Sequence, residues 1–526
     1  MRHRIPLIAL LGATALALTS CAGGGATAAG NDAALANGKT FTYAIATDPG
    51  SLDPFVTVLS VARNIDRFLY ARLVEVKDDG TVTSGLAEKW TADTTTATFT
   101  LRDKVTCEDG TPLTATAVAA NITHIADPAT ASPLLGLQVQ PGTTAVGDDA
   151  ARTVTVTSGH PDAFLLDNVG SVPIVCGTVM KDPKALAAGK GATGMFTMTQ
   201  VTPNSQYELT RRKDFTWGPG NWDAAQKGLP DKTVFRVIPN QTTATNLLLS
   251  GEVNAANVTG PDQKRLEQAK LFSAQIVTPA GELTYNQASG RPTADPAVRK
   301  ALTQSLDLAQ ARQVLGGVEP TGLVTVVPNP CRADTVKGNV AGYDAKAAGA
   351  ALDAAGWKLG SDGVRTKDGK PLALKMIYST QLGDTGTAAA ELLQSMWKKA
   401  GATVTVTAVD GPTLSETLFS TGDWDISGAA LTVGLPSQLV PFYSGPASPN
   451  GTNFAGVDNA DYKASVTAAS TKAGTEGCDD WAAGEKALMT TSTVVPYANL
   501  AVPTFGNKAT FTVGDGIDPT SIRMYQ

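Results

Sequence analysis

The stretch that decides the fold runs from Leu69 to Ile122 and reads "LYARLVEVKDDGTVTSGLAEKWTADTTTATFTLRDKVTCEDGTPLTATAVAANI". Around its start, apolar residues recur at helical spacing and predict one buried helix face: Ile65, Phe68, Leu69 and Leu73. Further along, "TATFTLRD" alternates apolar and polar residues with period two, which predicts a strand. The lone Cys107 stands between that strand and an acidic turn at Asp109–Gly110. Helix, strand and turn in one stretch predict an α/β protein.

The same alternation continues through the rest of the chain. Further strands are predicted at residues 41–46, 206–212, 233–239, 373–379 and 403–409. Helices are predicted at 242–249, 295–306, 344–356 and 386–401. Asp295 is the expected N-cap of one helix, with Pro296 at its first position, and Gly356 and Gly401 are expected to end the two later helices. Strands that alternate with helices in this way favour the α/β class throughout.

The N-terminus predicts export and a lipid anchor. Basic residues from Arg2 to Arg4 precede an apolar run, Ile5–Leu18, that is short for a membrane span. The run ends in Leu-Thr-Ser-Cys, the spacing of a bacterial lipoprotein signal, so residues 1–20 are the expected signal peptide and Cys21 the lipidated residue. Residues 21–38 are rich in Gly, Ala and Asn and predict a flexible tether. An uncleaved membrane anchor is the alternative interpretation.

Size and charge bound the remaining possibilities. The chain has 526 residues, too many for a single core, which predicts two or three lobes. Its formal net charge is −6, and the expected leader carries Arg2 and Arg4 without an acid, so the exported chain is more acidic still. An acidic chain argues against nucleic acid as a partner. No second long apolar run follows the leader, so the expected membrane contact is the lipid alone.

Motifs for catalysis, metals and cofactors are weak. Gly189–Gly194 fits G-x-G-x-x-G, but a helix-like segment precedes it and a strand-like one follows, the reverse of a nucleotide site. After the leader the only histidines are His124 and His160, and no cysteines have metal-site spacing. The acidic pairs Asp148–Asp149 and Asp479–Asp480 are interpreted as solvated turn residues. We therefore expect no catalytic residue, no metal ligated by the protein and no cofactor; a chelated metal held by arginines is the alternative that stays open.

The opening stretch resembles the family 5 extracellular solute-binding proteins of ABC importers, which include peptide- and nickel-binding proteins. The resemblance rests on a Leu-Tyr-x-x-Leu helix, Leu-Ala-x-x-Trp at 86–90, Phe-x-Leu-Arg at 99–102 and Asp-Gly-x-Pro-Leu at 109–113. "PGSLDP" at 49–54 is similar to the opening loop of the family. Segments at 294–307, 343–357 and 454–469 match later blocks of the family in the correct order.

The resemblance implies a bilobal α/β fold of the periplasmic-binding-protein type II, with an interlobe ligand cleft and three subregions. Residues 39–84, 194–287 and 496–526 are expected to form the main subdomain of lobe 1, residues 85–193 its small subdomain, and residues 288–495 lobe 2. The chain is expected to cross between the lobes near Gln287 and Pro496. Ligand would bind between the lobes, which close around it.

The resemblance also implies which residues contact the ligand. These are Ser51 and Leu52 of the opening loop, Tyr285 and Asn286 at the cleft floor, Trp424 and Asp425, and the loop residues Thr432, Val433 and Gly434. In peptide binders of the family that loop carries an acid for the peptide N-terminus, but here it has no charge. An unpaired ammonium in a dry cleft would be costly. Either Asp425 or another acid takes the amine, or the ligand is not an ordinary free-amine peptide.

Four cysteines remain once Cys21 is set aside, and an even number in an oxidising compartment predicts two disulfides. Of the three connectivities, Cys107–Cys176 and Cys331–Cys478 are favoured, because each pair then lies within one of the expected lobes. Where this chain has Cys107, the family usually has an aromatic residue. Peptide mapping without reduction tests the assignment.

The resulting hypothesis is a monomeric, extracytoplasmic, lipid-anchored binding protein that captures a peptide or similar solute for an ABC permease. It is not expected to be an enzyme. Within the class, an oligosaccharide or other uncharged-solute binder is the alternative, supported by the missing acid. A secreted hydrolase and a surface scaffold are the alternatives from other classes; the first predicts turnover, and the second predicts no ligand-dependent thermal shift.

Overall fold

A computed structural model describes residues 34–57, 59–77, 80–326 and 329–526. The expected signal peptide, Cys21 and most of the expected tether lie outside these residues. Within the described ranges, no helix combines the length and apolar character needed to cross a membrane.

A mixed ten-stranded sheet runs through the molecule in the order β17-β16-β18-β12-β19-β11-β1-β10-β9-β8. Its strands are β1 (Thr40–Ile45), β8 (Phe196–Thr202), β9 (Gln206–Arg211), β10 (Lys232–Val237), β11 (Ala255–Asn257), β12 (Phe272–Tyr285), β16 (Ala373–Ser379), β17 (Thr403–Val409), β18 (Ile426–Ser427) and β19 (Val494–Gly506). The strands predicted at residues 41–46, 206–212, 233–239, 373–379 and 403–409 correspond to β1, β9, β10, β16 and β17. Parallel pairs, β1 with β10 and β16 with β17, occur in both halves of the sheet.

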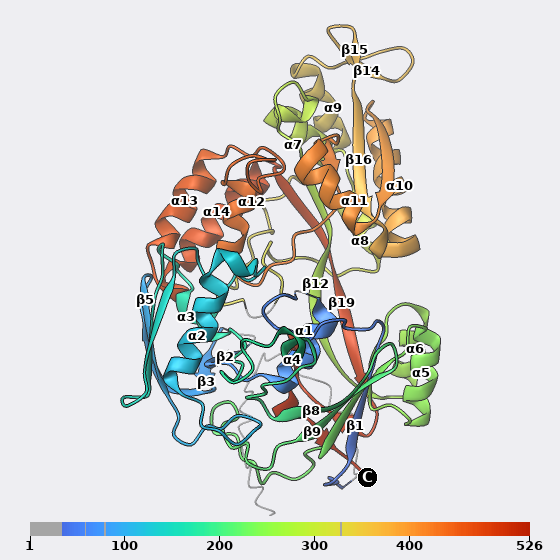
Figure 1. The fold of residues 1–526 in the computed structure, drawn as a ribbon. Coiled ribbons are helices and arrows are strands. Elements are labelled where there is room, and N and C mark those ends of the chain that lie inside the picture. The colour runs from blue at the N-terminus through green and yellow to red at the C-terminus, as the bar shows by residue number, and fades with distance from the viewer. Residues whose placement is uncertain (1–33, 58, 78–79, 327–328) are drawn as a thin grey trace, which may run out of the picture.

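The long antiparallel strands β12 and β19 connect two lobes, as Figure 1 shows. The lower lobe holds β1 and β8–β11, and the upper lobe holds β16–β18. Leu283 and Tyr285 at one end of β12 pack in the upper core with Val495 of β19, whereas Phe272 at the other end packs against the lower core. The chain therefore changes lobe inside these strands rather than at their upper ends, where the sequence placed the crossings.

The lower lobe carries a second, four-stranded sheet in the order β4-β5-β7-β6. Its strands are β4 (Ala87–Ala92), β5 (Thr96–Leu101), β6 (Thr144–Asp148) and β7 (Thr153–Thr157), and the helix α2 (Ala115–Ala126) packs against it. Thr114 caps α2 by accepting a hydrogen bond from the Ala117 amide. The disulfide Cys107–Cys176 closes this part of the lobe, which confirms the predicted pairing.

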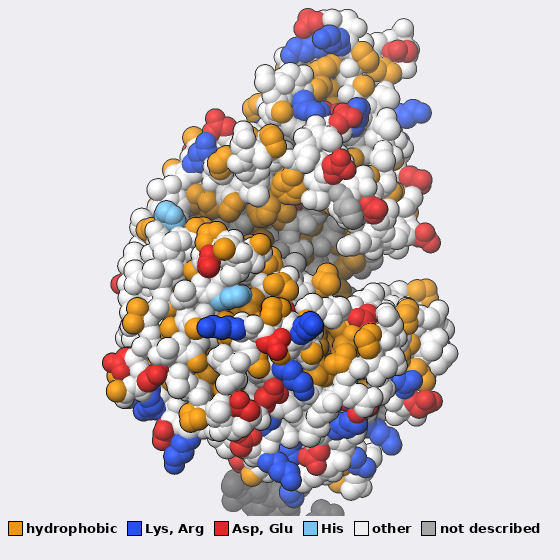
Figure 2. All heavy atoms as spheres, viewed as in Figure 1, with side chains coloured by type: hydrophobic (Ala, Val, Ile, Leu, Met, Phe, Trp, Pro, Cys, Tyr) orange, Lys and Arg blue, Asp and Glu red, His pale blue; other side chains and the backbone are white. Residues whose placement is uncertain are grey.

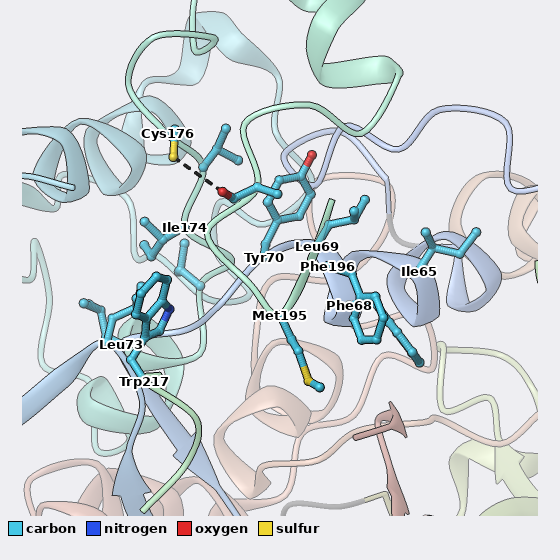
Figure 3. Close-up of a cluster of buried hydrophobic side chains, with 14 of the residues drawn as sticks. Ile65, Phe68, Leu69, Tyr70, Leu73, Ile174, Cys176, Met195, Phe196 and Trp217 are labelled. Carbon is cyan, nitrogen blue, oxygen red and sulfur yellow. Dashed lines mark hydrogen bonds between the residues drawn. The ribbon is translucent and has the colours of Figure 1, made fainter. Parts of the chain in front are cut away.

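The helix α1 (Ser60–Leu69) joins the main part of the lower lobe to its small sheet. Its apolar residues Ile65, Phe68 and Leu69 are fully buried, and Figure 3 shows Phe68 beside Phe196 of β8. The helix ends at Leu69 because Tyr70 takes up an extended backbone conformation. Leu73, which the spacing assigned to the same helix, is buried beyond its end.

The remaining elements complete the two lobes. Lower-lobe helices are α3 (Leu165–Gly170), α4 (Pro183–Ala187), α5 (Gln241–Ser250) and α6 (Pro261–Gln268). Upper-lobe helices are α7 (Pro296–Gln304), α8 (Leu308–Leu315), α9 (Ala345–Ala354), α10 (Gly383–Lys399), α11 (Gly411–Glu416), α12 (Val440–Tyr443), α13 (Ala460–Ser470) and α14 (Cys478–Thr490). Short strand pairs are β2 (Val74–Val76) with β3 (Val82–Ser84), β14 (Arg365–Lys367) with β13 (Lys358–Leu359) and β15 (Lys370–Pro371), β20 (Ala509–Thr510) with β23 (Arg523–Met524), and β21 (Val513–Gly514) with β22 (Gly516–Ile517).

Three helix-end signals in the sequence are confirmed. Asp295 caps α7 by accepting a hydrogen bond from the Ala297 amide, with Pro296 at the first helical position. Gly356 and Gly401 follow α9 and α10 with φ of 90° and 93°. Those positive values place both residues in the left-handed region, which glycine enters without the steric cost that a Cβ imposes.

The two lobes touch beside the small sheet. The Phe164 ring lies 6.0 Å from the Trp481 ring of α14, centroid to centroid. The Gly474 amide donates a 2.6 Å hydrogen bond to the Ala163 carbonyl. The disulfide Cys331–Cys478, also as predicted, ties the start of α14 to the long segment between α8 and α9.

A buried acid, Glu282, lies in β12 near the change of lobe. The residue is 3% exposed, and its side chain accepts one long hydrogen bond, 3.4 Å, from the Leu431 amide. Burial, with a smaller contribution from the charge of Glu485, raises the pKa of Glu282 to about 8.

This raised pKa predicts stability that falls as the pH rises. The folded protein holds a proton that the unfolded chain loses near pH 4.5, so the free energy of unfolding decreases between about pH 5 and pH 8 by the order of 3 kcal/mol. Glu282→Gln should flatten that part of a urea-unfolding pH profile, and Glu416→Gln, on the exposed end of α11, should not. If Glu282→Gln keeps the wild-type slope, the assignment of this pH dependence to Glu282 is wrong.

Candidate functional site

A cavity of about 370 Å³ lies between the two lobes. The lower lobe contributes the opening loop, α1, α3 and the β21–β22 turn; the upper lobe contributes the loop after β18 and Val326. Figure 2 shows hydrophobic side chains gathered along the junction of the lobes. A volume in this range suits a small organic ligand.

One face of α1 supplies much of the charge in the cavity. Arg63, Asp66 and Arg67 follow the spacing i, i+3, i+4, which puts them on one side of the helix, and all three line the cavity together with Tyr70, which follows the end of α1. The buried apolar residues of α1 occupy its other side. The helix is thus fixed in the lower core by one face and presents a charged face to the space between the lobes.

Asp515, at the turn between β21 and β22, holds two of the arginines. Its Oδ2 lies 3.1 Å from the Arg63 Nη2 and 2.8 Å from the Arg72 Nη2. Burial alone would raise the pKa of Asp515, but the charges of Arg72, Arg63 and Arg67 outweigh it and hold that pKa well below its usual range. Arg67 pairs with Glu75 at 3.4 Å.

The carboxyl group of Asp66, unlike that of Asp515, is buried without a hydrogen-bond partner in the described part of the chain. The residue is 5% exposed and lines the cavity, and neither of its carboxylate oxygens has a hydrogen-bond partner among the described residues. Burial raises its pKa well above the ordinary value; the charge of Asp53 adds to that rise, and the charges of Arg63 and Arg72 oppose it.

Asp167 of α3 is a second acid on the cavity wall. Burial raises its pKa to about 6, with a backbone hydrogen bond opposing the rise and the charge of Asp162 adding to it. The cavity lining thus contains three arginines and three acids, which differ in how fully each is paired.

The upper wall of the cavity is mostly apolar. Thr432, Val433 and Gly434 line it, followed by Leu435 and Phe442. The Gly434 and Leu435 amides donate to the Gln438 Oε1 at 3.1 and 3.2 Å, which fixes the loop. The three loop residues named from the sequence are therefore brought to the cavity.

The other predicted upper residues lie outside the lining of the cavity. Tyr285 is buried, with its hydroxyl 3.2 Å from the Thr303 Oγ1, and the Asn286 Nδ2 donates to the Trp424 carbonyl at 2.9 Å. The Asp425 Oδ1 lies 2.7 Å from the Arg291 Nη1, and its Oδ2 accepts from the Lys375 amide at 2.8 Å.

These bonds give a structural role to all four residues, and Asp425 is not the free acid that the missing loop charge called for. The strand end that the sequence placed at the cleft floor is instead inside the upper lobe, where β12 pairs with β18.

The opening loop reaches the cavity with residues next to the predicted ones. Leu52 is fully buried and its amide donates to the Ala187 carbonyl, while Ser51 accepts from the Asp53 amide. Pro54 and Thr57 of the same loop line the cavity.

The residues that the sequence raised as candidates for catalysis or metal binding take part in turns, ring packing and a helix start. Gly189–Gly194 lies between α4 and β8, the order expected from the sequence. The His124 ring packs on the Phe55 ring with centroids 4.9 Å apart. Asp479 and Asp480 lie in the first turn of α14 rather than in a loop, because acids are stabilised at a helix N-terminus. Over the described ranges, no three His, Cys, Asp or Glu side chains are grouped to hold a metal.

Sequence reasoning missed the charged face of α1 and its partner Asp515. The signal for the first was present as a charged i, i+3, i+4 pattern opposite the apolar stripe, but such a pattern usually marks a solvated helix face. The second had no local signal, since Asp515 and Arg72 are 443 positions apart.

A second cavity, of about 610 Å³, adjoins the first. Arg67 and Asp515 line both, and the second also includes Glu75, Lys77 and Asp518. The ion pairs around Asp515 therefore lie between the two cavities.

Comparison with known proteins identifies relatives over most of the chain. Residues 81–453 match the family described as "Bacterial extracellular solute-binding proteins, family 5 Middle". The periplasmic murein peptide-binding protein MppA of Escherichia coli K12 is 26% identical over 497 residues, 88% of each chain. The nickel-binding periplasmic protein of the same strain is 27% identical over 358 residues, 64% of this chain and 65% of the relative.

Solved structures extend the likeness to both lobes. The ABC transporter substrate-binding protein CtaP of Listeria monocytogenes matches with a TM-score of 0.77 at 20% identity, covering 93% of this chain and all of that one. The unliganded open form of MppA matches with a TM-score of 0.72 at 22% identity, covering 94% and 99%. At these identities the structures establish the bilobal fold.

Proposed function

This chain belongs to the bacterial extracellular solute-binding proteins of family 5 and has their bilobal type II fold, and from that premise we propose that it captures a peptide or a similar mid-sized solute between its lobes. The observation that carries the proposal is the interlobe cavity, whose charged wall comes from one lobe and whose apolar wall comes from the other. A ligand in that space contacts both walls only when the lobes are together, so its binding favours closure.

The charges on α1 favour a charged solute over an uncharged oligosaccharide. The arginines are paired with Asp515 and Glu75, but the two carboxyl oxygens of Asp66 have no hydrogen-bond partner among the described residues, and a cationic group on the solute would supply one. Relatives in the family include proteins named for binding murein peptide and glutathione. Capture by closure needs no chemistry, and the proposal is a binding protein rather than a hydrolase.

The wider setting is part of the same proposal. The protein would deliver its solute to an ABC permease, as a monomer held outside the cytoplasm by a lipid on Cys21. Mass spectrometry of Cys21 in membrane-purified protein tests the anchor; a free thiol there would contradict it.

The function is tested by native mass spectrometry and thermal shift with a peptide pool and a glycan pool. We expect a retained solute of peptide mass and a rise in the melting temperature with peptides. Appreciable turnover of any pool would contradict a binding role, and a shift with glycans alone would contradict the peptide class.

Filling the cavity from its upper wall is expected to block binding. Thr432 is exposed and lines the cavity, so Thr432→Trp adds bulk there without disturbing a core. We expect at least a tenfold loss of peptide affinity, or about 1.4 kcal/mol, by isothermal titration calorimetry, with an unchanged melting temperature. Thr467→Trp, on the exposed face of α13, is the matched control. Undiminished binding by the Thr432 variant would place the ligand elsewhere.

A further inference from the structure

We propose that Asp66 is the residue that binds a primary ammonium group of the solute, and that it loses a proton to solvent when it does so. This inference rests on the proposed function, since it assigns the ligand chemistry of the same cavity. It also names the acid that the uncharged loop at Thr432–Gly434 lacks.

The first support is the unmet bonding of Asp66. Its two oxygens are buried on the cavity wall and accept no hydrogen bond from the described residues. A buried polar group without a partner is costly, and native structures rarely leave one. An ammonium group brings three N–H donors and a positive charge, enough to satisfy both oxygens.

The second support is that the nearby arginines are held elsewhere. Arg63, one turn before Asp66 on α1, and Arg72, beyond the end of the helix, both direct a guanidinium nitrogen at Asp515. They lie close enough to act on Asp66 through their charge but give it no hydrogen bond. The pairing with Asp515 thus keeps the cationic side chains from closing the site.

The other acids within reach are already engaged or less suited. Asp515 holds two arginines, and Asp425 is bonded to Arg291 and Lys375 inside the upper lobe. Asp167 lines the same cavity and is the competing candidate, so a test of Asp66 has to include a variant of Asp167.

The charged groups around Asp66 and its burial together determine its pKa and therefore whether the carboxyl carries a proton. From its own helix and the segment after it come Arg63, Tyr70 and Arg72, and from the opening loop comes Asp53. Asp66 is buried beside another acid, so its pKa is raised well above the ordinary value despite the arginines. In the free protein the carboxyl therefore holds a proton at pH values where an exposed aspartate would not.

Ligand binding reverses that balance. An ammonium against the carboxyl favours the ionised form, so the Asp66 O–H bond breaks, its proton passes to the buffer, and the ligand keeps its own three protons. The affinity for an ammonium ligand should then rise with pH, by up to about tenfold per unit, until the free protein has itself lost the proton.

Calorimetry with two probes tests the proposal. Tri-L-alanine and N-acetyl-tri-L-alanine differ in the ammonium group, and titration of each in phosphate and in Tris at one pH gives the number of protons released. We expect the wild type to bind the free amine at least tenfold more tightly and to release up to one proton. Asp66→Asn should lose both the preference and the proton release. Asp167→Asn, in the same cavity, should change the affinity for the two probes alike, and Asp458→Asn, exposed and outside the cavity lining, is the unchanged control.

Each other outcome overturns a defined part of the argument. Equal binding of the two probes by the wild type refutes the ammonium site and leaves the peptide-binding function standing. Loss of the preference in the Asp167 variant alone assigns the role to Asp167 and refutes Asp66. Binding of neither probe refutes the proposed function together with this inference.

The melting temperature of Asp66→Asn shows whether the substitution disturbs the fold. Because the raised pKa means that ionising Asp66 destabilises the free protein, Asp66→Asn should melt at the wild-type temperature or above it at neutral pH. A much lower melting temperature would show that Asp66 has a structural role, which contradicts the proposal.

Discussion

Replacing Cys331 and Cys478 together by alanine is expected to lower the free energy of unfolding by about 5 kcal/mol, the value that loop-closure entropy assigns to a loop of this length. The disulfide joins positions 147 residues apart, so without it the unfolded chain gains a large set of conformations. Equilibrium urea unfolding under non-reducing conditions, followed by circular dichroism, measures the difference.

The second disulfide is the internal comparison. Cys107 and Cys176 are 69 residues apart, and the same reasoning gives about 4 kcal/mol for their replacement. The two double variants should therefore rank by loop length. If the Cys331–Cys478 variant unfolds at the wild-type urea concentration, the crosslink does not restrict the unfolded chain as proposed.

The Cys331–Cys478 variant should also bind ligand less well. The segment between α8 and α9 carries Val326, which lines the interlobe cavity. Besides the disulfide, that segment is held by Glu485 of α14, which accepts hydrogen bonds from the Leu323 amide at 3.1 Å and the Thr335 hydroxyl at 2.5 Å. Losing one of these ties loosens one wall of the cavity while the rest of the upper lobe stays packed.

Local signals in the sequence were sufficient for much of the fold. Asp295 before Pro296 predicted the start of α7 because the cap and the proline act within one turn. The strand predicted from "TATFTLRD" was correct because alternation follows from having one buried face, and every second residue of β5 is buried. Leu73 was misplaced because spacing alone does not reveal where a backbone leaves the helix, and Tyr70 leaves it three residues earlier.

The site was less predictable because its chemistry depends on distant partners. Asp425 is a plausible partner for the ligand amine by sequence, but it is paired with Arg291, 134 positions away. Asp66 looks like one charge on a solvated helix, and only the fold shows that it is buried and lacks a donor. The loop at Thr432–Gly434, which lines the cavity, was singled out through the family resemblance, which supplied long-range information that local patterns lack.

Asp515→Asn is expected to destabilise the lower lobe by about 3 kcal/mol and to weaken ligand binding. The side chain is 18% exposed and lies between Arg63 and Arg72. Asp515→Asn leaves these two guanidinium groups without the carboxylate that balances their positive charges. Arg63 is half exposed, which places the expected loss at the lower end for a buried pair. Freed from Asp515, the arginines can turn to Asp66 and occupy the oxygens proposed for the ligand.

The pH dependence of this variant separates charge from packing. The pKa of Asp515 is lowered in the folded protein, so its stabilising contribution is complete above the ordinary carboxyl pKa near 4 and is lost as the pH falls below it. The gap between wild type and Asp515→Asn in urea unfolding should be full at pH 7 and should shrink toward pH 3, opposite in sign to the trend from Glu282. Asp458→Asn removes an exposed pair with Lys463 and should change little at any pH. A gap that stays constant with pH would mean that Asp515 acts through its shape, and the arginines would then not need its charge to leave Asp66 free.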